Sequence, residues 1–196
     1  MSQLPRPLSD EDRRALLDLA RRAVTFAVEN RGPLDVVPGP GMLSVHAGAF
    51  VTLHRRDRLR GCMGQLEPDE ALARVVAHCA TSAAREDPRF EPVRVAELGE
   101  IEIEISVLSP LTPIRPEEIE TGKHGLVVTR GEKRGVLLPQ VAARYGWTGE
   151  RFLEETCVKG GMEREAWRDP ATRIEAVIAD VFSEADFGSE SRRRAV

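Results

Sequence analysis

Apolar residues recur with helical spacing in several parts of the chain. Residues 9–30 carry leucine, alanine and valine on one stripe, and Ser9 followed by Asp12 resembles a capping box. Asp69 is a plausible cap for a second helix, which is expected to end before Pro88. The pattern also predicts a short helix after residue 139 and a helix over residues 148–159.

Other segments have the alternation or the composition of strands. In residues 100–108, isoleucine and valine alternate with glutamate and serine, so one face of this strand is expected to be core. Further strands are predicted over residues 50–54, 59–63, 126–129, 136–138 and 173–182. A polar turn separates the strands over residues 50–54 and 59–63, and a glycine-rich turn separates those over residues 126–129 and 136–138. Each of these two pairs is therefore predicted to form a hairpin.

Strand pairs separated by isolated helices, without strict β-α-β alternation, favour an α+β fold with a mainly antiparallel sheet flanked by helices. A length of 196 residues fits one folding unit. We expect an N-terminal extension over residues 1–8 and one domain over residues 9–182. Residues 183–196 have no apolar pattern and are predicted to form a disordered tail.

Composition narrows the class of protein. Apolar residues make up 41% of the chain and charged residues 31%, which is the balance of a globular protein. No apolar run could span a bilayer and no signal peptide is recognisable, so a cytoplasmic location without membrane association is expected. The net charge of −4 argues against general DNA binding. Three cysteines without tight spacing predict free thiols, and the histidine and cysteine spacings predict neither a metal site nor a cofactor.

The segment around Cys62 is the strongest candidate for chemistry. Arg60 and Cys62 are two residues apart on a predicted strand, so both side chains are expected on one face. A nearby guanidinium would lower the pKa of the thiol and favour the reactive thiolate. Gly61 and Gly64 leave room for a ligand or for another backbone. The alternative is that Cys62 is a small buried residue beside a glycine bulge, and core packing is favoured for Cys79 and Cys157.

Two charged groups have both a functional and a structural interpretation. Glu102 and Glu104 could act as general acid or base, although the solvated face of an antiparallel sheet normally carries such residues. The basic stretch of residues 54–60 suits a small anionic ligand, or the phosphates of a nucleotide or RNA, although a solvated turn is the favoured interpretation. It lacks the aromatic residues that stack on single strands.

Leu59-Arg60-Gly61-Cys62-Met63-Gly64 resembles the signature hexapeptide of the AMMECR domain family, which normally has Ile in place of Met63. Other segments with the family's pattern follow in the expected order, over residues 50–53, 86–90, 101–110, 135–141 and 166–170. The resemblance implies an α+β fold with a smaller second lobe and a signature segment near a groove. It also suggests a pathway shared with Memo-like and radical-SAM proteins, but it implies no reaction.

These observations leave the molecular function open, including whether the chain is an enzyme. Our first hypothesis is a thiol-bearing component of that pathway, with Cys62, Arg60 and Glu104 as catalytic candidates. Gly61, Gly64, Arg89 and Glu102 are candidates for binding. Arg89 belongs to the other charged family segment, so Arg89 and Cys62 are expected beside one concave surface. The alternatives are a protein-interaction module without catalysis, in which Arg60 anchors an acidic partner, and binding of RNA or a nucleotide.

Overall fold

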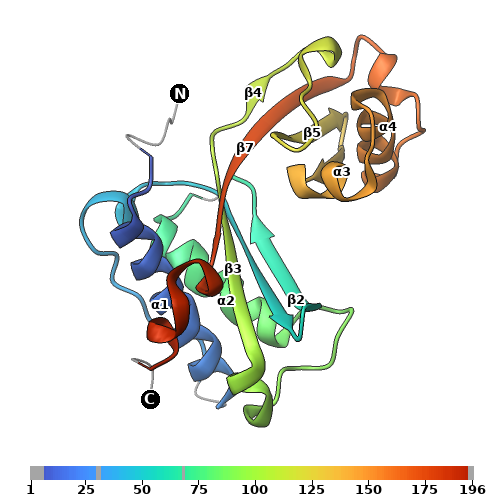
Figure 1. Ribbon diagram of the computed structural model, residues 1–196. Coiled ribbons are helices and arrows are strands. Elements are labelled where there is room, and N and C mark those ends of the chain that lie inside the picture. The colour runs from blue at the N-terminus through green and yellow to red at the C-terminus, as the bar shows by residue number, and fades with distance from the viewer. Residues whose placement is uncertain (1–6, 30–31, 68, 194–196) are drawn as a thin grey trace. The chain divides into compact units, whose positions relative to one another are not determined.

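The computed structural model describes residues 7–29, 32–67 and 69–193 (Figure 1). The chain divides into two compact units, the first formed by residues 1–108 with 180–196 and the second by residues 109–179. Most of the predicted N-terminal extension, the last residue of the predicted first helix and the end of the predicted tail lie outside the described residues. Both units combine antiparallel strands with helices, which confirms the predicted α+β class.

The first unit contains a sheet in the order β2-β1-β3, with every neighbouring pair antiparallel. Its strands are β1 (Ala49–Arg55), β2 (Arg58–Gln65) and β3 (Ile101–Leu108). The hairpin between β1 and β2 turns at Arg56 and Asp57, which both have positive φ. This conformation is that of the two-residue turns that match the twist of a hairpin.

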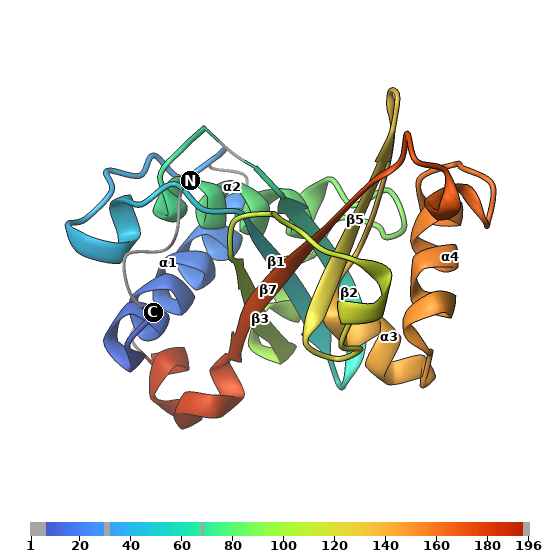
Figure 2. The same cartoon turned by 90° about the horizontal axis from the view of Figure 1, so that it is seen from above.

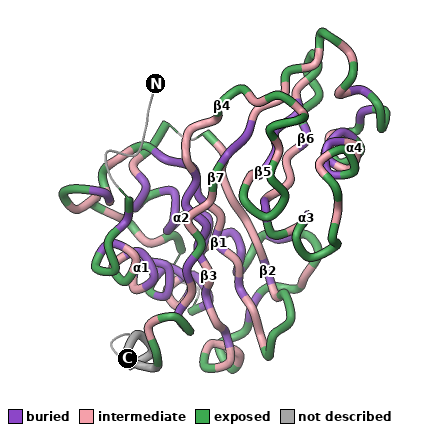
Figure 3. Tube along the Cα trace, turned by 45° about the horizontal axis from the view of Figure 1, so that its top comes forward, coloured by how far each residue is buried: buried purple, intermediate pink, exposed green. Residues whose placement is uncertain are grey.

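Helices α1 (Asp10–Val28) and α2 (Leu72–Arg85) cover one face of this sheet (Figures 1 and 2). The alternation predicted for residues 100–108 is confirmed, since Ile101, Ile103 and Ile105 are buried in the core to which both helices contribute. Along β1, buried and half-buried residues alternate in the same way, as Figure 3 shows. The capping box of Ser9 and Asp12 is also confirmed, but α2 has Ala71 at its N-cap in place of the predicted Asp69.

Short elements complete the first unit: η1 (Gly41–Ser44), η2 (Val95–Glu100) and η5 (Glu184–Arg193). The start of η5 differs from the predicted disordered tail. Glu184 is buried and forms a two-pronged ion pair with Arg21 of α1, and it also accepts the backbone N–H of Ile103 at 3.0 Å. The buried carboxylate of Glu184, together with Phe187 packed against the core, therefore anchors a segment that has no apolar pattern.

The strands of the second unit are β5 (His124–Arg130), β6 (Lys133–Leu137) and β7 (Arg173–Ser183), whose last residues belong to the first unit. Strand β5 pairs with β7 on one side and with β6 on the other, and both pairs are antiparallel. The short strand β4 (Thr112–Pro113) pairs with β7. Helices α3 (Pro139–Tyr145) and α4 (Gly149–Lys159) follow the hairpin, and Thr148 caps α4 as predicted. The turns η3 (Pro116–Glu118) and η4 (Ala166–Arg168) complete this unit. Its core contains Leu126, Val128, Phe152 and Leu153.

Candidate functional site

Three polar side chains form a row across the sheet of the first unit, on the face opposite α1 and α2. Thr52 of β1 has Cys62 of β2 as its partner on one side and Glu104 of β3 on the other. The backbone N–H of Cys62 donates to Asp87, so it points away from β1. Thr52 and Cys62 are thus a non-hydrogen-bonded pair, in which side chains approach closely. The Thr52 hydroxyl donates to Cys62 Sγ at 3.4 Å.

The ionisation of Cys62 differs from the prediction. Burial raises the pKa of the thiol above its ordinary value, and this effect outweighs the hydrogen bond from Thr52 and the positive charge of Arg89. Cys62 is therefore a neutral thiol at pH 7. Burial also raises the pKa of the Glu104 carboxyl group, while the charge of His54 opposes that rise. A carboxylate with a raised pKa is a stronger base than an ordinary glutamate.

Asp87 and Arg89 hold the outer edge of β2 at Cys62. Asp87 Oδ2 accepts the backbone N–H of Cys62 at 2.9 Å, and Arg89 Nη2 lies 3.5 Å from the Cys62 carbonyl oxygen. The two side chains also pair with each other at 2.7 Å. The hydrogen bond from Arg89, with those from the two backbone N–H groups, lowers the pKa of Asp87 well below its usual range. Arg89 and Cys62 are thus neighbours, while the expectation that both line one concave surface stays a prediction.

Arg60 has a different environment from the one predicted. The strand pairing shifts between Leu53 and His54, which leaves Arg60 as the extra residue of a β-bulge. Its guanidinium binds Glu97 at 3.0 Å and donates to the carbonyl oxygens of Glu91 and Pro92. Arg60 is not among the groups that shift the pKa of Cys62, which are Thr52, Arg89, Asp87 and Glu104. The expectation that Arg60 activates the thiol is therefore wrong, and the bulge is the physical reason.

The glycines of the hexapeptide accommodate neighbouring groups of the protein itself. A Cβ atom on Gly61 would lie 2.1 Å from the carbonyl oxygen of Ala83, so Gly61 permits close packing of α2 against β2. A Cβ atom on Gly64 would meet the ring of Phe50 at 2.1 Å, because that ring covers the glycine. Met63 packs against the core, where it can replace the isoleucine usual at that position.

The basic stretch at the hairpin is largely neutralised. Glu100 pairs with Arg55 at 3.1 Å and with Arg56 at 2.8 Å, while Glu97 pairs with both Arg55 and Arg60. Arg58 is exposed and makes no ion pair with a described residue. These carboxylates reduce the positive potential that an anionic ligand would need. Glu102 lies opposite His54 in the strand register, on the same face as Glu104.

The remaining cysteines are core residues. Cys79 of α2 and Cys157 of α4 are buried, and burial raises the pKa of Cys79 to about 12. Within residues 7–29, 32–67 and 69–193, no three histidine, cysteine or acidic side chains are grouped as metal ligands. No described helix combines the length and apolarity needed to cross a membrane.

Sequence reasoning missed two members of this site, Thr52 and Asp87. The strand register that selects Thr52 as the neighbour of both Cys62 and Glu104 becomes visible only once the strands are paired. Asp87 belongs to a segment that had been singled out, but its buried carboxylate gives no signal in the sequence. The site is therefore a thiol, hydroxyl and carboxyl row, supported at its edge by Asp87 and Arg89.

The fold and this row define an α+β protein with antiparallel strands flanked by helices and a half-buried cysteine on the sheet face opposite the helices. The AMMECR1 family profile matches residues 17–182. A protein of Methanothermobacter thermautotrophicus is 40% identical over 189 residues, covering 91% of this chain and 97% of its own length. A protein of Aeropyrum pernix is also 40% identical, over 93% of this chain and 83% of its own length.

The similarity extends to a solved structure. The crystal structure of an uncharacterized protein from Pyrococcus horikoshii matches with a TM-score of 0.82 and 35% sequence identity, over 90% of this chain and 93% of that one. The chain belongs to the AMMECR1 family. This confirms the resemblance inferred from the hexapeptide around Cys62.

Proposed function

We propose that the outer face of the β2-β1-β3 sheet is a thiol site, in which Cys62 acts as the nucleophile of a pathway component with Memo-like and radical-SAM partners. The observation that carries this proposal is the row of Cys62, Thr52 and Glu104 across adjacent strands. The family resemblance alone supports the choice of partners.

The row supplies the groups that a buried thiol needs in order to react. A thiol becomes nucleophilic when it loses its proton, and burial works against this in Cys62. The hydrogen bond from Thr52 stabilises the thiolate, and Arg89 contributes positive charge. Glu104, with its raised pKa, is the candidate base, and because Thr52 lies between it and Cys62 the proton would have to pass through the Thr52 hydroxyl. In this mechanism the neutral thiol is the resting form, and substrate binding triggers the transfer.

A docking surface without chemistry is the second candidate function. The raised pKa of Cys62 favours it, because a neutral thiol can serve simply as a small apolar contact. Arg60 is a poor anchor for an acidic partner in this case, since its side chain is only 16% exposed and already binds Glu97. A docking role would therefore use Cys62, Arg89 and the neighbouring face of the sheet.

Brief alkylation of the native protein with iodoacetamide, followed by peptide mass mapping, separates the two candidates. We expect Cys62 to be modified before Cys79 and Cys157, because both of these are buried. If Glu104 is the base, Glu104→Gln should slow the modification of Cys62, although loss of its negative charge alone would lower the pKa of the thiol and speed the reaction. Equal modification of all three cysteines, or no effect of Glu104→Gln, would favour the docking surface.

A further inference from the structure

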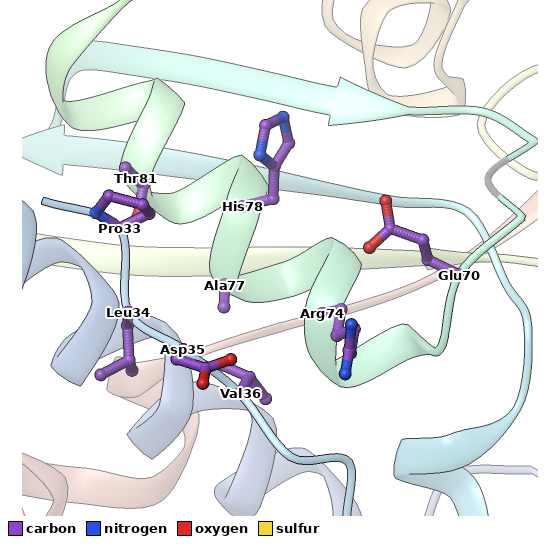
Figure 4. A pocket seen from close by; sticks show the side chains of 9 residues that line it. All are labelled: Pro33, Leu34, Asp35, Val36, Glu70, Arg74, Ala77, His78 and Thr81. Atoms are coloured by element: carbon purple, nitrogen blue, oxygen red, sulfur yellow. The ribbon is translucent and has the colours of Figure 1, made fainter.

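A concave site separate from the row of Cys62, Thr52 and Glu104 lies on the first unit, between α2 and the segment that follows α1. It has a volume of about 170 Å³ (Figure 4). Its lining consists of Pro33, Leu34, Asp35, Val36, Glu70, Arg74, Ala77, His78 and Thr81. The members from α2 are spaced three and four residues apart, so they belong to one side of the helix. The function proposed above uses none of these residues.

The floor of this pocket is apolar. Leu34 and Val36 are half-buried and pack against the main core, and Ala77 is only 4% exposed. Figure 4 shows that the Ala77 side chain projects from α2 toward the segment that carries Leu34. The floor therefore offers a short aliphatic surface, which suits a ligand with a small branched side chain.

The rim of the pocket carries both signs of charge. Asp35 and Glu70 are acidic, while Arg74 and His78 lie one helical turn apart on α2. The side chains of these residues form no hydrogen bond or ion pair with any residue that the structure describes. Asp35 lies on the loop that forms one side of the pocket and Arg74 on α2, which forms the other, so the two sides carry opposite charges (Figure 4). A ligand that carries both an ammonium and a carboxylate group would satisfy both walls.

We infer that this pocket binds a small aliphatic α-amino acid with both its ammonium and its carboxylate group free. Arg74 would bind the carboxylate, because a guanidinium matches its planar geometry. Asp35 would accept hydrogen bonds from the ammonium group, and the side chain would rest on Leu34, Val36 and Ala77. Since the pocket is shallow and the ligand small, the expected Kd is on the order of 1 mM.

The test is a titration of the ¹⁵N-labelled full chain with L-leucine, monitored by NMR. Saturable shifts are expected at residues 34–36 and 74–81. N-acetyl-L-leucine lacks the ammonium group and L-leucinamide lacks the carboxylate, so both should bind at least about tenfold more weakly. The dipeptide Gly-Leu separates a free amino acid from a chain terminus, and it too should bind more weakly.

Two variants and a control assign the charges. Arg74→Gln and Asp35→Asn should each weaken the binding of L-leucine by about tenfold or more. Arg22→Gln, an exposed arginine of α1 outside the pocket, should leave it unchanged. The inference is overturned if L-leucine gives no saturable shift, if the blocked analogues or Gly-Leu bind equally well, or if both pocket variants bind like the unmodified protein. Cys62 alkylation is a separate readout, so failure here leaves the proposed function standing.

Discussion

The two units contain the same arrangement of a hairpin, a helix and a third strand, which the sequence did not reveal as a repeat. In the first unit β3 pairs with β1, the first strand of its hairpin, and in the second β7 pairs with β5 in the same way. A glycine on the second hairpin strand contacts a helix carbonyl in both. Gly61 lies against Ala83 of α2, and Gly135 lies against Thr156 of α4.

The two sheets differ in the row next to that glycine. In the first unit the row is Cys62, Thr52 and Glu104. In the second unit, the residues at the same register positions are Val136, Val127 and Glu175. At these register positions the second unit therefore has valines in place of the thiol of Cys62 and the hydroxyl of Thr52. The comparison indicates that Gly61 serves the architecture common to both units, whereas Cys62 and Thr52 are additions to it.

The largest predicted effect tests the shared part of the comparison. Gly61→Ala and Gly135→Ala should each destabilise the protein by roughly 3 kcal/mol or more, because the new Cβ atom would lie 2.1 Å and 1.9 Å from a helix carbonyl oxygen. Urea denaturation measures the loss.

Gly99→Ala is the matched control for these variants, since a Cβ atom there meets nothing within 4 Å. It should change the free energy of unfolding by no more than about 0.5 kcal/mol. If Gly61→Ala were as mild as this control, the role of Gly61 in packing α2 would be wrong.

The next effect concerns the bulge at Arg60. Arg60→Ala should cost roughly 2 kcal/mol, because the Arg60 and Glu97 side chains are only 16% and 12% exposed. Arg58→Ala, in the same hairpin but exposed, should cost less than about 0.5 kcal/mol. Thermal unfolding at pH 7 compares the two, and equal losses would contradict a structural role for Arg60.

The same ion pair predicts a dependence on pH. The hydrogen bond from Arg60 helps to lower the pKa of Glu97 from 4.5 to about 2. A carboxyl group whose pKa is lower in the folded state stabilises the protein above its unfolded pKa. This contribution should be lost as the pH falls from about 4.5 toward 2. The free energy of unfolding, measured at several pH values in this range, should therefore depend less on pH in Arg60→Ala than in the unmodified protein.

The smallest effect sharpens the comparison of the two turns. Asp57 has a φ of 61° in the first hairpin, whereas the second turn has Gly131 at a φ of 59°. Asp57→Gly should therefore stabilise the protein by about 0.5 kcal/mol, since glycine adopts this conformation without strain. Glu132→Gly, at a position without positive φ, should give no gain. Denaturant midpoints of both variants measure the difference.

The fold could be predicted because its signals are local. The alternation of isoleucine and glutamate over residues 100–108 predicts a strand with one buried face, and β3 has that face against the helices. Ser9 and Thr148 are adjacent to the helices that they cap. Such patterns depend on residues a few positions apart, so sequence spacing is sufficient to identify them.

The details of the site depend on contacts between residues that are far apart in the sequence. A one-residue bulge changes the environment of Arg60, and nothing in the local composition marks it. Asp87 reaches Cys62 across 25 residues, and Glu184 reaches Arg21 across 163. These single polar contacts have no periodic signal. Cys62, Glu104 and Arg89 could be singled out from the sequence, but Thr52 and Asp87 could not.

The central claim is that Thr52, and not Arg60, tunes the thiol of Cys62. The direct test is the pH at which Cys62 alkylation reaches half its maximal rate, measured in the unmodified protein, Thr52→Val and Arg60→Ala. Because burial raises the pKa of Cys62, the midpoint in the unmodified protein should lie above the ordinary value of about 8.5. Thr52→Val removes the hydrogen bond to Sγ and should move the midpoint higher, while Arg60→Ala should leave it unchanged. A midpoint that moves with Arg60→Ala but not with Thr52→Val would contradict the account.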